Sequence, residues 1–284
     1  MKIKIALILT VLFLISCKQE ANKVEGQGLK NTKLEGSIFG TFYQVTYDSE
    51  VNYEKQFDSL FFVINKSMST YQADSDISKL NRNESNEVDK HFIKVFEASK
   101  IIYEETEGAF DPTIGALVNA WDFGPEGKIV NLDSLKIDAL MESVGFNKVS
   151  VVENKVTKQP NTFLDFNAIA KGYAVDAVAD FLSSKNVQNF LVNIGGELNA
   201  KGINIEKQSG WTVGVENPNF DGTQSWDKVF VLKDAAMATS GTYRKFKIDE
   251  NGNRYAHIID TKTGYPSKTN LLSISVIAED CMTA

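Results

Sequence analysis

Apolar and polar residues follow helical spacing in the first half of the chain and strand-like spacing in the second. Apolar side chains at three- and four-residue intervals predict amphipathic helices at 53–66 and 90–107, and further helices are expected at 134–144 and 168–184. Short apolar runs between Gly, Asn, Asp or Pro residues predict strands at 36–47, 149–156, 163–166, 190–194, 198–203, 211–215, 229–232, 243–248 and 272–278. Helices gathered early and strands gathered late favour an α+β fold over an alternating, doubly wound sheet. We therefore expect a single elaborated domain over residues 34–284.

The first seventeen residues have the composition of a lipoprotein signal. Lysines at positions 2 and 4 precede an apolar run that ends in Leu14-Ile15-Ser16-Cys17. Because this run is shorter than the ~20 residues of a membrane-spanning helix, cleavage before Cys17 is favoured over an uncleaved membrane anchor. We expect a signal peptide at 1–16, lipid on Cys17 and a flexible polar tether up to residue 33. The expected location is a bacterial membrane, at the periplasmic side of the inner membrane or at the outer membrane.

Composition and charge argue against several classes of partner and of site. Hydrophobic residues make up 43% of the chain and charged residues 24%, which is ordinary for a globular protein. A net charge of −7 argues against nucleic acid as a partner. The histidines are His91 and His257 and the cysteines Cys17 and Cys281, too few for a histidine-rich zinc site or a disulfide framework. Any metal is therefore expected to have oxygen ligands.

Several segments rich in small and polar residues are candidates for chemistry. In residues 67–71 and 74–78, a loop with a helix cap at Asp74 or Ser75 is the simpler interpretation. Residues 110–115 contain an Asp-Pro pair after a helix, which is typical of a turn. Neither segment alone indicates a function.

Residues 165–173 run from a strand directly into a helix. The first turn of a helix offers unpaired N–H groups and partial positive charge, and Lys171 adds a full charge there, so an anionic group would be stabilised. A solvated lysine is the competing interpretation. Residues 193–197 end a strand with Gly195 and Gly196, which suits either an anion-binding nest or a hairpin turn.

The last candidate segments are 238–244, with hydroxyls and an arginine, and 255–266, which contains His257. A lone histidine is more often structural, but this one lies near Asp260 and close in sequence to the hydroxyl cluster. Both interpretations stay open on these residues alone.

Taken in order, these motifs resemble the FAD:protein FMN transferase family. The matching segments are Gly-Thr at 40–41, MSTY at 68–71, FDPT at 110–113, AIAKG at 168–172, GGE at 195–197, SGTYR at 240–244 and HIID at 257–260. They extend across nearly the whole expected domain. The resemblance implies a Mg²⁺-dependent enzyme that cleaves FAD and attaches FMN through a phosphoester to a Thr or Ser of an exported or membrane redox protein, releasing AMP.

The resemblance also implies roles for individual residues. Ala168 would offer its backbone carbonyl to Mg²⁺, and His257 is our candidate general base. The residues expected to bind FAD are Phe39, Ser75, Asp76, Ile77, Asp111, Thr113, Lys171, Gly196, Glu197, Thr242 and Ile259. Phe39 stands where the family usually has methionine, which keeps an apolar wall but leaves its contact with FAD open.

One part of the family pattern has no counterpart here. An Asp-x-x-x-Thr motif that would supply metal-ligand side chains is not found up to Ala284, so we expect the C-terminal part of the domain to be missing. Two alternatives to FMN transfer remain: hydrolysis of FAD to FMN and AMP at the same site, and a non-catalytic flavin-binding lipoprotein.

Overall fold

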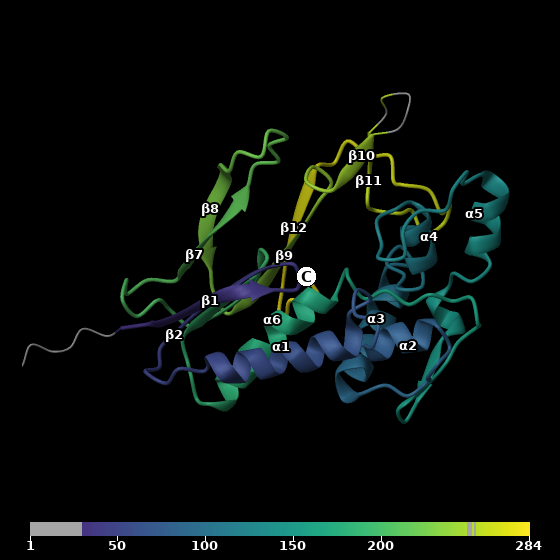
Figure 1. The fold of residues 1–284 in the computed structure, drawn as a ribbon. Helices are drawn as coiled ribbons and strands as arrows, with labels where there is room; N and C mark the ends of the chain where they lie inside the picture. The colour runs from purple at the N-terminus through teal and green to yellow at the C-terminus, as the bar shows by residue number, and fades with distance from the viewer. Residues whose placement is uncertain (1–29, 249–251, 253) are drawn as a thin grey trace, which may run out of the picture.

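The computed structural model describes residues 30–248, 252 and 254–284, and Figure 1 colours them along the chain. The expected signal peptide, Cys17 and most of the expected tether lie outside these residues, so the lipid anchor stays a prediction. Within the described residues, no helix combines the length and the apolar character needed to cross a membrane.

A six-stranded antiparallel sheet forms the centre of the fold, in the order β1-β2-β5-β6-β9-β12. Its strands are β1 (Thr32–Ile38), β2 (Thr41–Tyr47), β5 (Phe190–Ile194), β6 (Glu197–Lys201), β9 (Ala235–Gly241) and β12 (Ser273–Ala278). The chain reverses between β1 and β2 at Phe39 and Gly40, which both have positive φ. Tight turns join β1 to β2 and β5 to β6, longer segments make the other connections between neighbouring strands, and β12 lies at one edge.

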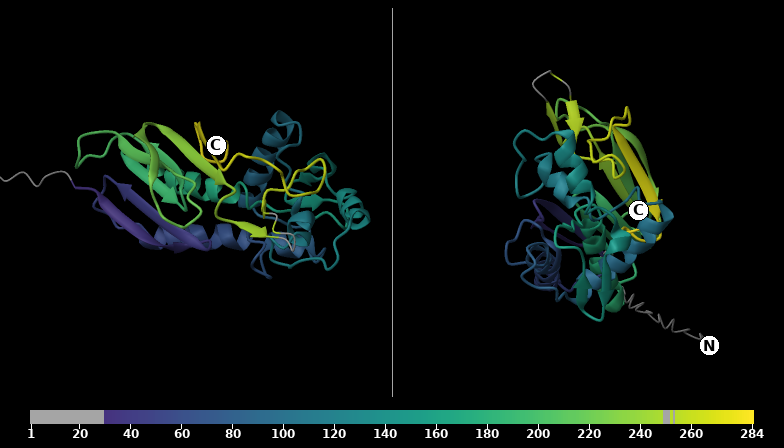
Figure 2. Two further views of the ribbon diagram at one scale, coloured as in Figure 1. Left: turned by 90° about the horizontal axis from the view of Figure 1, so that it is seen from above. Right: turned by 90° about the vertical axis from the view of Figure 1, so that its right-hand side faces the viewer.

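Helices cover one face of this sheet. Helices α1 (Glu54–Met68), α3 (Lys90–Glu105) and α6 (Ala170–Ser184) pack together there, with α6 against β5 and β6, as Figures 1 and 2 show. Helix α1 buries Phe57, Phe61, Ile64 and Met68, which recur every three or four residues. Each such burial stabilises the fold by about 1.5–3 kcal/mol relative to exposure. The predicted amphipathic stripe therefore faces the core.

The other face of the sheet is covered by a hairpin of β7 (Trp211–Glu216) and β8 (Trp226–Leu232). Trp211 and Leu232 of this hairpin pack with Leu198 of β6 and Met237 of β9 in a second apolar cluster. Because successive strand residues point to opposite faces, β6 directs Leu198 to this hairpin and Glu197 to the helical side. That alternation positions one residue of the candidate site.

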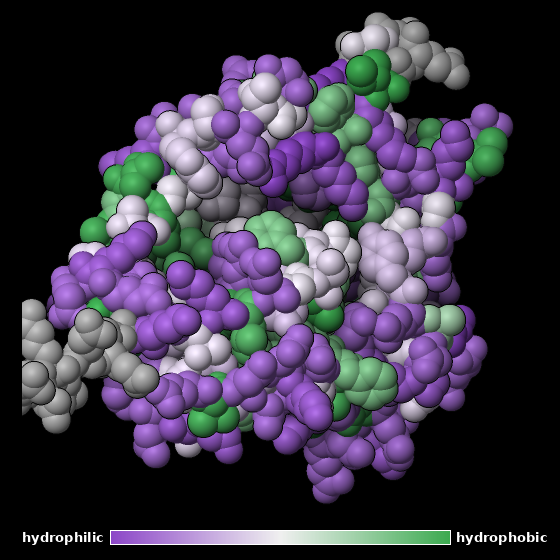
Figure 3. All heavy atoms as spheres, turned by 60° about the vertical axis from the view of Figure 1, so that its left-hand side comes forward, coloured by the Kyte–Doolittle hydropathy of each residue, from purple (hydrophilic) through white to green (hydrophobic). Residues whose placement is uncertain are grey.

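Shorter elements gather at the end of the molecule away from the β7–β8 hairpin (Figure 1). They are α2 (Asp76–Asn81), α4 (Gly115–Ala120), α5 (Ser134–Met141), η1 (Phe146–Lys148), β3 (Ser150–Val152), β4 (Lys155–Thr157), β10 (Phe246–Ile248) and β11 (Arg254–Ala256). The face in Figure 3 is mostly hydrophilic, and its apolar residues form separate patches.

The α+β prediction is confirmed, and the four predicted helices exist with ends shifted by up to three residues. The single strand expected at 36–47 is wrong, because the left-handed backbone at Phe39 breaks it into a hairpin. The strand expected at 163–166 is wrong as well, since only an isolated bridge from Phe163 to Ile114 forms there. Strand β9 was not predicted, because its small residues (AAMATSG) lack the large apolar side chains that mark a strand.

Candidate active site

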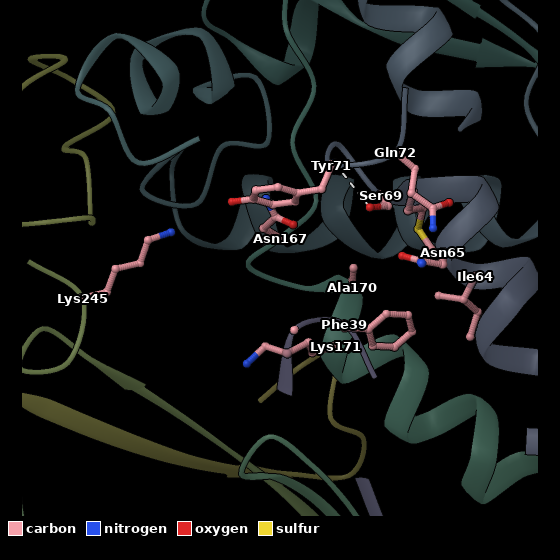
Figure 4. Close-up of a pocket in the computed structure, with 12 residues that line it drawn as sticks. Phe39, Ile64, Asn65, Ser69, Tyr71, Gln72, Asn167, Ala170, Lys171 and Lys245 are labelled. Atoms are coloured by element: carbon pink, nitrogen blue, oxygen red, sulfur yellow. Dashed lines mark hydrogen bonds between the residues drawn. The ribbon is translucent and has the colours of Figure 1, made fainter. Parts of the chain in front are cut away.

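A cavity of about 650 Å³ opens where the end of α1, the β1–β2 turn and the start of α6 meet (Figure 4). Its walls are formed by Phe39, Gly40, Ile64, Asn65, Met68, Ser69, Tyr71, Gln72, Asn167, Ala170, Lys171 and Lys245. Apolar and amide side chains there face two lysines and no carboxylate. Such a lining suits a ligand that joins a flat apolar ring to an anionic group.

Phe39 forms part of the apolar side of the cavity. It has a φ of 51° in the β1–β2 turn, and its ring packs edge-on against Phe61 of α1 with centroids 5.8 Å apart. Left-handed backbone is uncommon for a bulky residue, and packing against the core offsets this strain. Ile64 and Met68 extend the buried stripe of α1 to the same wall.

The loop after α1 carries Tyr71 and Gln72 to the cavity. One buried side chain closes this loop: Ser75 Oγ donates to the Ser69 carbonyl at 2.7 Å and accepts from the Ser78 amide at 3.1 Å. Ser75 is thus the N-cap of α2, as one reading of the sequence predicted. It supports the cavity wall without lining it, and its contact with FAD stays a prediction.

The start of α6 brings a cation to the cavity. Just before the helix, Asn167 donates its amide N–H to Asp165 Oδ1 at 2.7 Å, and this turn bends the chain into α6. Burial raises the pKa of Asp165, although hydrogen bonds from Asn167 oppose the shift. The Lys171 backbone N–H in the first turn donates to no described residue. A free donor and a cation therefore lie together, as an anion site requires.

Lys171 forms an ion pair with Glu197 across the interface between α6 and β6. Its Nζ lies 2.6 Å from Glu197 Oε1, and the Glu197 side chain is 13% exposed against 37% for Lys171. The second oxygen, Oε2, is buried and has no hydrogen-bond partner among the described residues. Glu197 does not line the cavity; it holds Lys171 in place, and its contact with FAD stays a prediction.

His257 does not line this cavity, but the backbone of a wall residue, Lys245, holds it. Its Nδ1 lies 3.1 Å from the Lys245 carbonyl oxygen, and its ring packs near Phe123 with centroids 6.2 Å apart. A carbonyl can only accept, so Nδ1 carries the proton and Nε2 keeps its lone pair. Burial lowers the pKa of His257, and the charges of Lys245 and Lys171 add to this while the hydrogen bond opposes it. The lowered pKa favours the neutral imidazole, which can accept a proton at Nε2.

Two predicted FAD-binding residues, Asp111 and Thr113, are buried behind the cavity. Asp111 Oδ1 accepts from the Thr113 amide at 2.8 Å and from Thr113 Oγ1 at 2.6 Å. Thr113 Oγ1 in turn accepts from the Gly145 amide at 2.7 Å. Burial raises the pKa of Asp111 against these hydrogen bonds. Both side chains tie the loop before α4 to the segment that follows α5.

The remaining predicted residues are distributed around the site. Ile77 and Ile259 are buried in the apolar clusters, and Asp76 lies in the first turn of α2, where burial and the charge of Asp89 raise its pKa. Thr242 lines a separate cavity of about 900 Å³. The Gly196 amide donates to Asn193 Oδ1 at 3.0 Å in the β5–β6 turn, which is the hairpin interpretation of this segment.

The structure adds Asn65, Gln72 and Lys245 to the site, which the sequence did not single out. Asn65 follows Ile64 within an apolar helical stripe, and Lys245 directly follows the SGTYR segment. A polar residue beside a buried stripe was the available signal for Asn65. Lys245 had no local signal, because only the tertiary fold brings residue 245 to the start of α6.

The described residues do not form a metal site by themselves. No three His, Cys, Asp or Glu side chains within residues 30–248, 252 and 254–284 converge as metal ligands. The carbonyl of Ala168, expected to bind Mg²⁺, accepts no backbone hydrogen bond from this part of the chain. One free carbonyl is a suitable but insufficient oxygen ligand, since Mg²⁺ has six oxygen ligands in near-octahedral geometry.

Known proteins are similar to this chain in sequence and in fold. The FAD:protein FMN transferase of Haemophilus influenzae is 37% identical over 291 residues, covering 96% of this chain and 81% of its own. The Vibrio cholerae enzyme of the same name is 35% identical over 288 residues, covering 97% and 82%. The structure titled Flavin Transferase ApbE from Vibrio cholerae matches with a TM-score of 0.79 at 34% identity, covering 90% of this chain and 84% of that one. A family model described as ApbE family matches residues 39–284. The chain therefore belongs to the ApbE family.

Proposed function

We propose that this protein transfers FMN from FAD to a Ser or Thr hydroxyl of an acceptor protein and releases AMP. The observation that carries the proposal is a cation in the cavity wall together with an imidazole that is bonded to another wall residue. Lys171 supplies the cation in the first turn of α6. His257 does not line the cavity, but its Nδ1 is held by the carbonyl of Lys245, which does line it, and its Nε2 keeps a lone pair. The similarity of this chain to the enzymes named above as FAD:protein FMN transferases also supports the proposal.

The cavity accounts for the binding of FAD. Its volume of about 650 Å³ is within the usual range for a small-molecule site. Phe39, Ile64 and Met68 offer an apolar surface for a ring, while Lys171 in the first turn of α6 would contact the pyrophosphate. The ion pair with Glu197 holds the lysine so that little side-chain entropy is lost on binding.

His257 accounts for activation of the acceptor. The hydroxyl oxygen forms a bond to the phosphorus on the FMN side of the pyrophosphate, and the bond from that phosphorus to the bridging oxygen breaks. AMP leaves with the bridging oxygen, and the hydroxyl proton passes to Nε2 of His257. General base catalysis of this kind contributes about 10²–10⁴-fold to the rate.

Mg²⁺ dependence is part of the proposal. A bound Mg²⁺ neutralises the charge of a pyrophosphate and is commonly held by one or two protein groups together with substrate phosphates. Ala168, with its free carbonyl at the start of α6, is the group that the described residues offer. Removal of the metal by a chelator should therefore abolish transfer while the apo fold persists.

We also propose that the protein acts on exported or membrane-bound redox proteins while anchored through Cys17. The N-terminal sequence supports this location. A flexible tether would raise the effective concentration of the enzyme near acceptors on the same membrane.

Incubation of the full chain with FAD, Mg²⁺ and an acceptor domain tests the activity. Intact-mass spectrometry should show the mass of FMN on the acceptor, and replacement of the acceptor hydroxyl by Ala should prevent it. Unmodified acceptor together with free FMN would indicate hydrolysis, which the same geometry allows because water can take the place of the hydroxyl at Nε2. FAD that is bound and left intact would indicate a non-catalytic flavin-binding protein.

A further inference from the structure

Lys245 is the second lysine of the cavity, and it comes from a different part of the chain than Lys171. It immediately precedes β10, whereas Lys171 lies in the first turn of α6. Figure 4 shows its side chain extending from the C-terminal segment toward Tyr71 and Asn167. Two cations therefore face one cavity from two independent elements.

The two lysines differ in how their charge is balanced. Lys171 is neutralised by Glu197 at 2.6 Å. Lys245 Nζ donates to the Phe123 carbonyl at 3.0 Å, and no carboxylate of the described residues lies within ion-pair distance of it. Among the described residues, Lys245 thus forms no ion pair, although its charge acts on the buried Asp165 carboxylate and opposes the rise in the pKa of Asp165. An ammonium has three donors, so this one keeps two for a ligand.

The position of Lys245 is also well defined. The bond to the Phe123 carbonyl fixes the ammonium, which lies 6.0 Å from the centroid of the Phe123 ring. Phe123 itself is 5% exposed and packs near His257. The backbone carbonyl of Lys245 holds His257 Nδ1. One residue thus carries a cation on its side chain and orients the imidazole with its backbone.

We propose that the Lys245 ammonium is a second phosphate-binding cation, which contacts the pyrophosphate of FAD together with Lys171. This inference rests on the proposed function, because it takes FAD as the ligand of the cavity. The chemistry follows from the charges: a pyrophosphate diester carries two negative charges, while the Lys171–Glu197 pair is neutral overall. Lys245 supplies the positive charge that the pair lacks, and charge-assisted hydrogen bonds to phosphate are among the stronger ones in proteins.

Binding measurements on the full chain with three substitutions test this role. Lys245→Met removes the charge and keeps the length, and Lys245→Arg keeps the charge. Lys247→Met is the matched control, because Lys247 pairs with Asp122 and lines another cavity. We expect Lys245→Met to weaken FAD binding about ten- to hundredfold, as for the loss of a hydrogen bond to a charged group. Lys245→Arg and Lys247→Met should bind FAD within about threefold of the wild type.

Riboflavin, which has the ring and no phosphate, separates a phosphate contact from a structural effect. Its affinity should be the same in the wild type and in Lys245→Met. Increasing NaCl should weaken FAD binding less in Lys245→Met than in the wild type, since one screened contact is gone. Equal losses for riboflavin and FAD, or an unchanged affinity for FAD, would overturn the proposal.

A kinetic measurement keeps this inference distinct from the proposed function. The carbonyl that holds His257 survives any side-chain change, so kcat at saturating FAD and pH 8 should change little in Lys245→Met while KM for FAD rises. If the wild type binds no FAD, the proposed function itself fails. If the wild type transfers FMN and Lys245→Met keeps the same KM, only the role of Lys245 is lost.

Discussion

Two sets of polar residues around the candidate site differ in how many of their donors and acceptors remain without a hydrogen-bond partner. In the layer behind the cavity, the side chains of Ser75, Asp111 and Thr113 are buried and bonded to neighbouring backbone or to each other. The second set, the facing layer, consists of Lys245 in the cavity wall and His257, which is bonded to the Lys245 carbonyl. Lys245 keeps two donors, and His257 keeps the lone pair of Nε2. Residues of similar polarity thus serve architecture where they are satisfied and chemistry where they are not. Substitutions in the two layers should therefore change different quantities.

The largest effect is expected for His257→Ala in the facing layer. Removing the base should slow transfer of FMN by about 10²–10⁴-fold while FAD still binds. Transfer is measured by intact mass of the acceptor, and binding by flavin fluorescence. The control is His91→Ala, since His91 lies away from the cavity and its Nδ1 contacts Tyr173 Oη at 2.6 Å. Equal rates in His257→Ala and the wild type would remove this histidine from the mechanism.

The next effect is expected in the layer behind the cavity. Thr113→Val keeps the shape of the side chain but leaves the Gly145 amide and the Asp111 carboxylate each without one partner. We expect the free energy of unfolding to fall by about 2–4 kcal/mol, the cost of buried groups left unpaired. Urea denaturation measures this.

Thr113→Ser is the matched variant, because it keeps both hydrogen bonds and loses one methyl group. Its loss should be about 1 kcal/mol. The folded fraction of Thr113→Val should keep its affinity for FAD if the side chain acts only behind the cavity. A drop in affinity with unchanged stability would instead place Thr113 in contact with FAD, as the family resemblance implies.

The sequence predicts the main helices and the Ser75 cap, but it does not predict that Asp111 and Thr113 are buried. Helices α1, α3 and α6 follow from apolar spacing, and the Ser75 cap follows from its place before a helix. These are local properties. That Asp111 and Thr113 are buried follows from contacts with residues 145 and 146, more than thirty positions away. Such contacts leave no periodic trace in the sequence.

The place of Lys245 in the site is even harder to predict from the sequence. Lys245 lies between β9, whose small residues give no strand pattern in the sequence, and the short hairpin of β10 and β11. Its neighbourhood in the fold is set by the order of strands in the sheet, which places β9 beside β6. Without that topology, nothing connects residue 245 with Lys171. The motif HIID likewise pointed to His257, but the carbonyl that fixes its tautomer is visible only in the fold.

A smaller effect is expected for Ser75→Ala, again behind the cavity. It removes the N-cap of α2 and the bond that closes the loop at Ser69. The free energy of unfolding should fall by about 0.5–2 kcal/mol, the usual range for a lost cap. The control is Ser59→Ala on the exposed side of α1, where the hydroxyl bonds only to the Lys55 carbonyl. Equal stabilities of the two variants would show that Ser75 does not secure the loop.

The smallest effect concerns the pH dependence of transfer. The neutral imidazole is the active form, and burial together with the charges of Lys245 and Lys171 lowers the pKa of His257 from its ordinary value of 6.5. The rate should therefore stay high as pH falls to 6.5 and decrease only below it. Replacement of Lys245 by Met removes one charge that disfavours the imidazolium, so the pKa should rise and the acid limb should move to higher pH. The profile is measured as initial rate at saturating FAD from pH 5 to 8. If the fall in rate at low pH persists in His257→Ala, a group other than His257 titrates. The same conclusion follows if this fall occurs at the same pH in Lys245→Met and in the wild type.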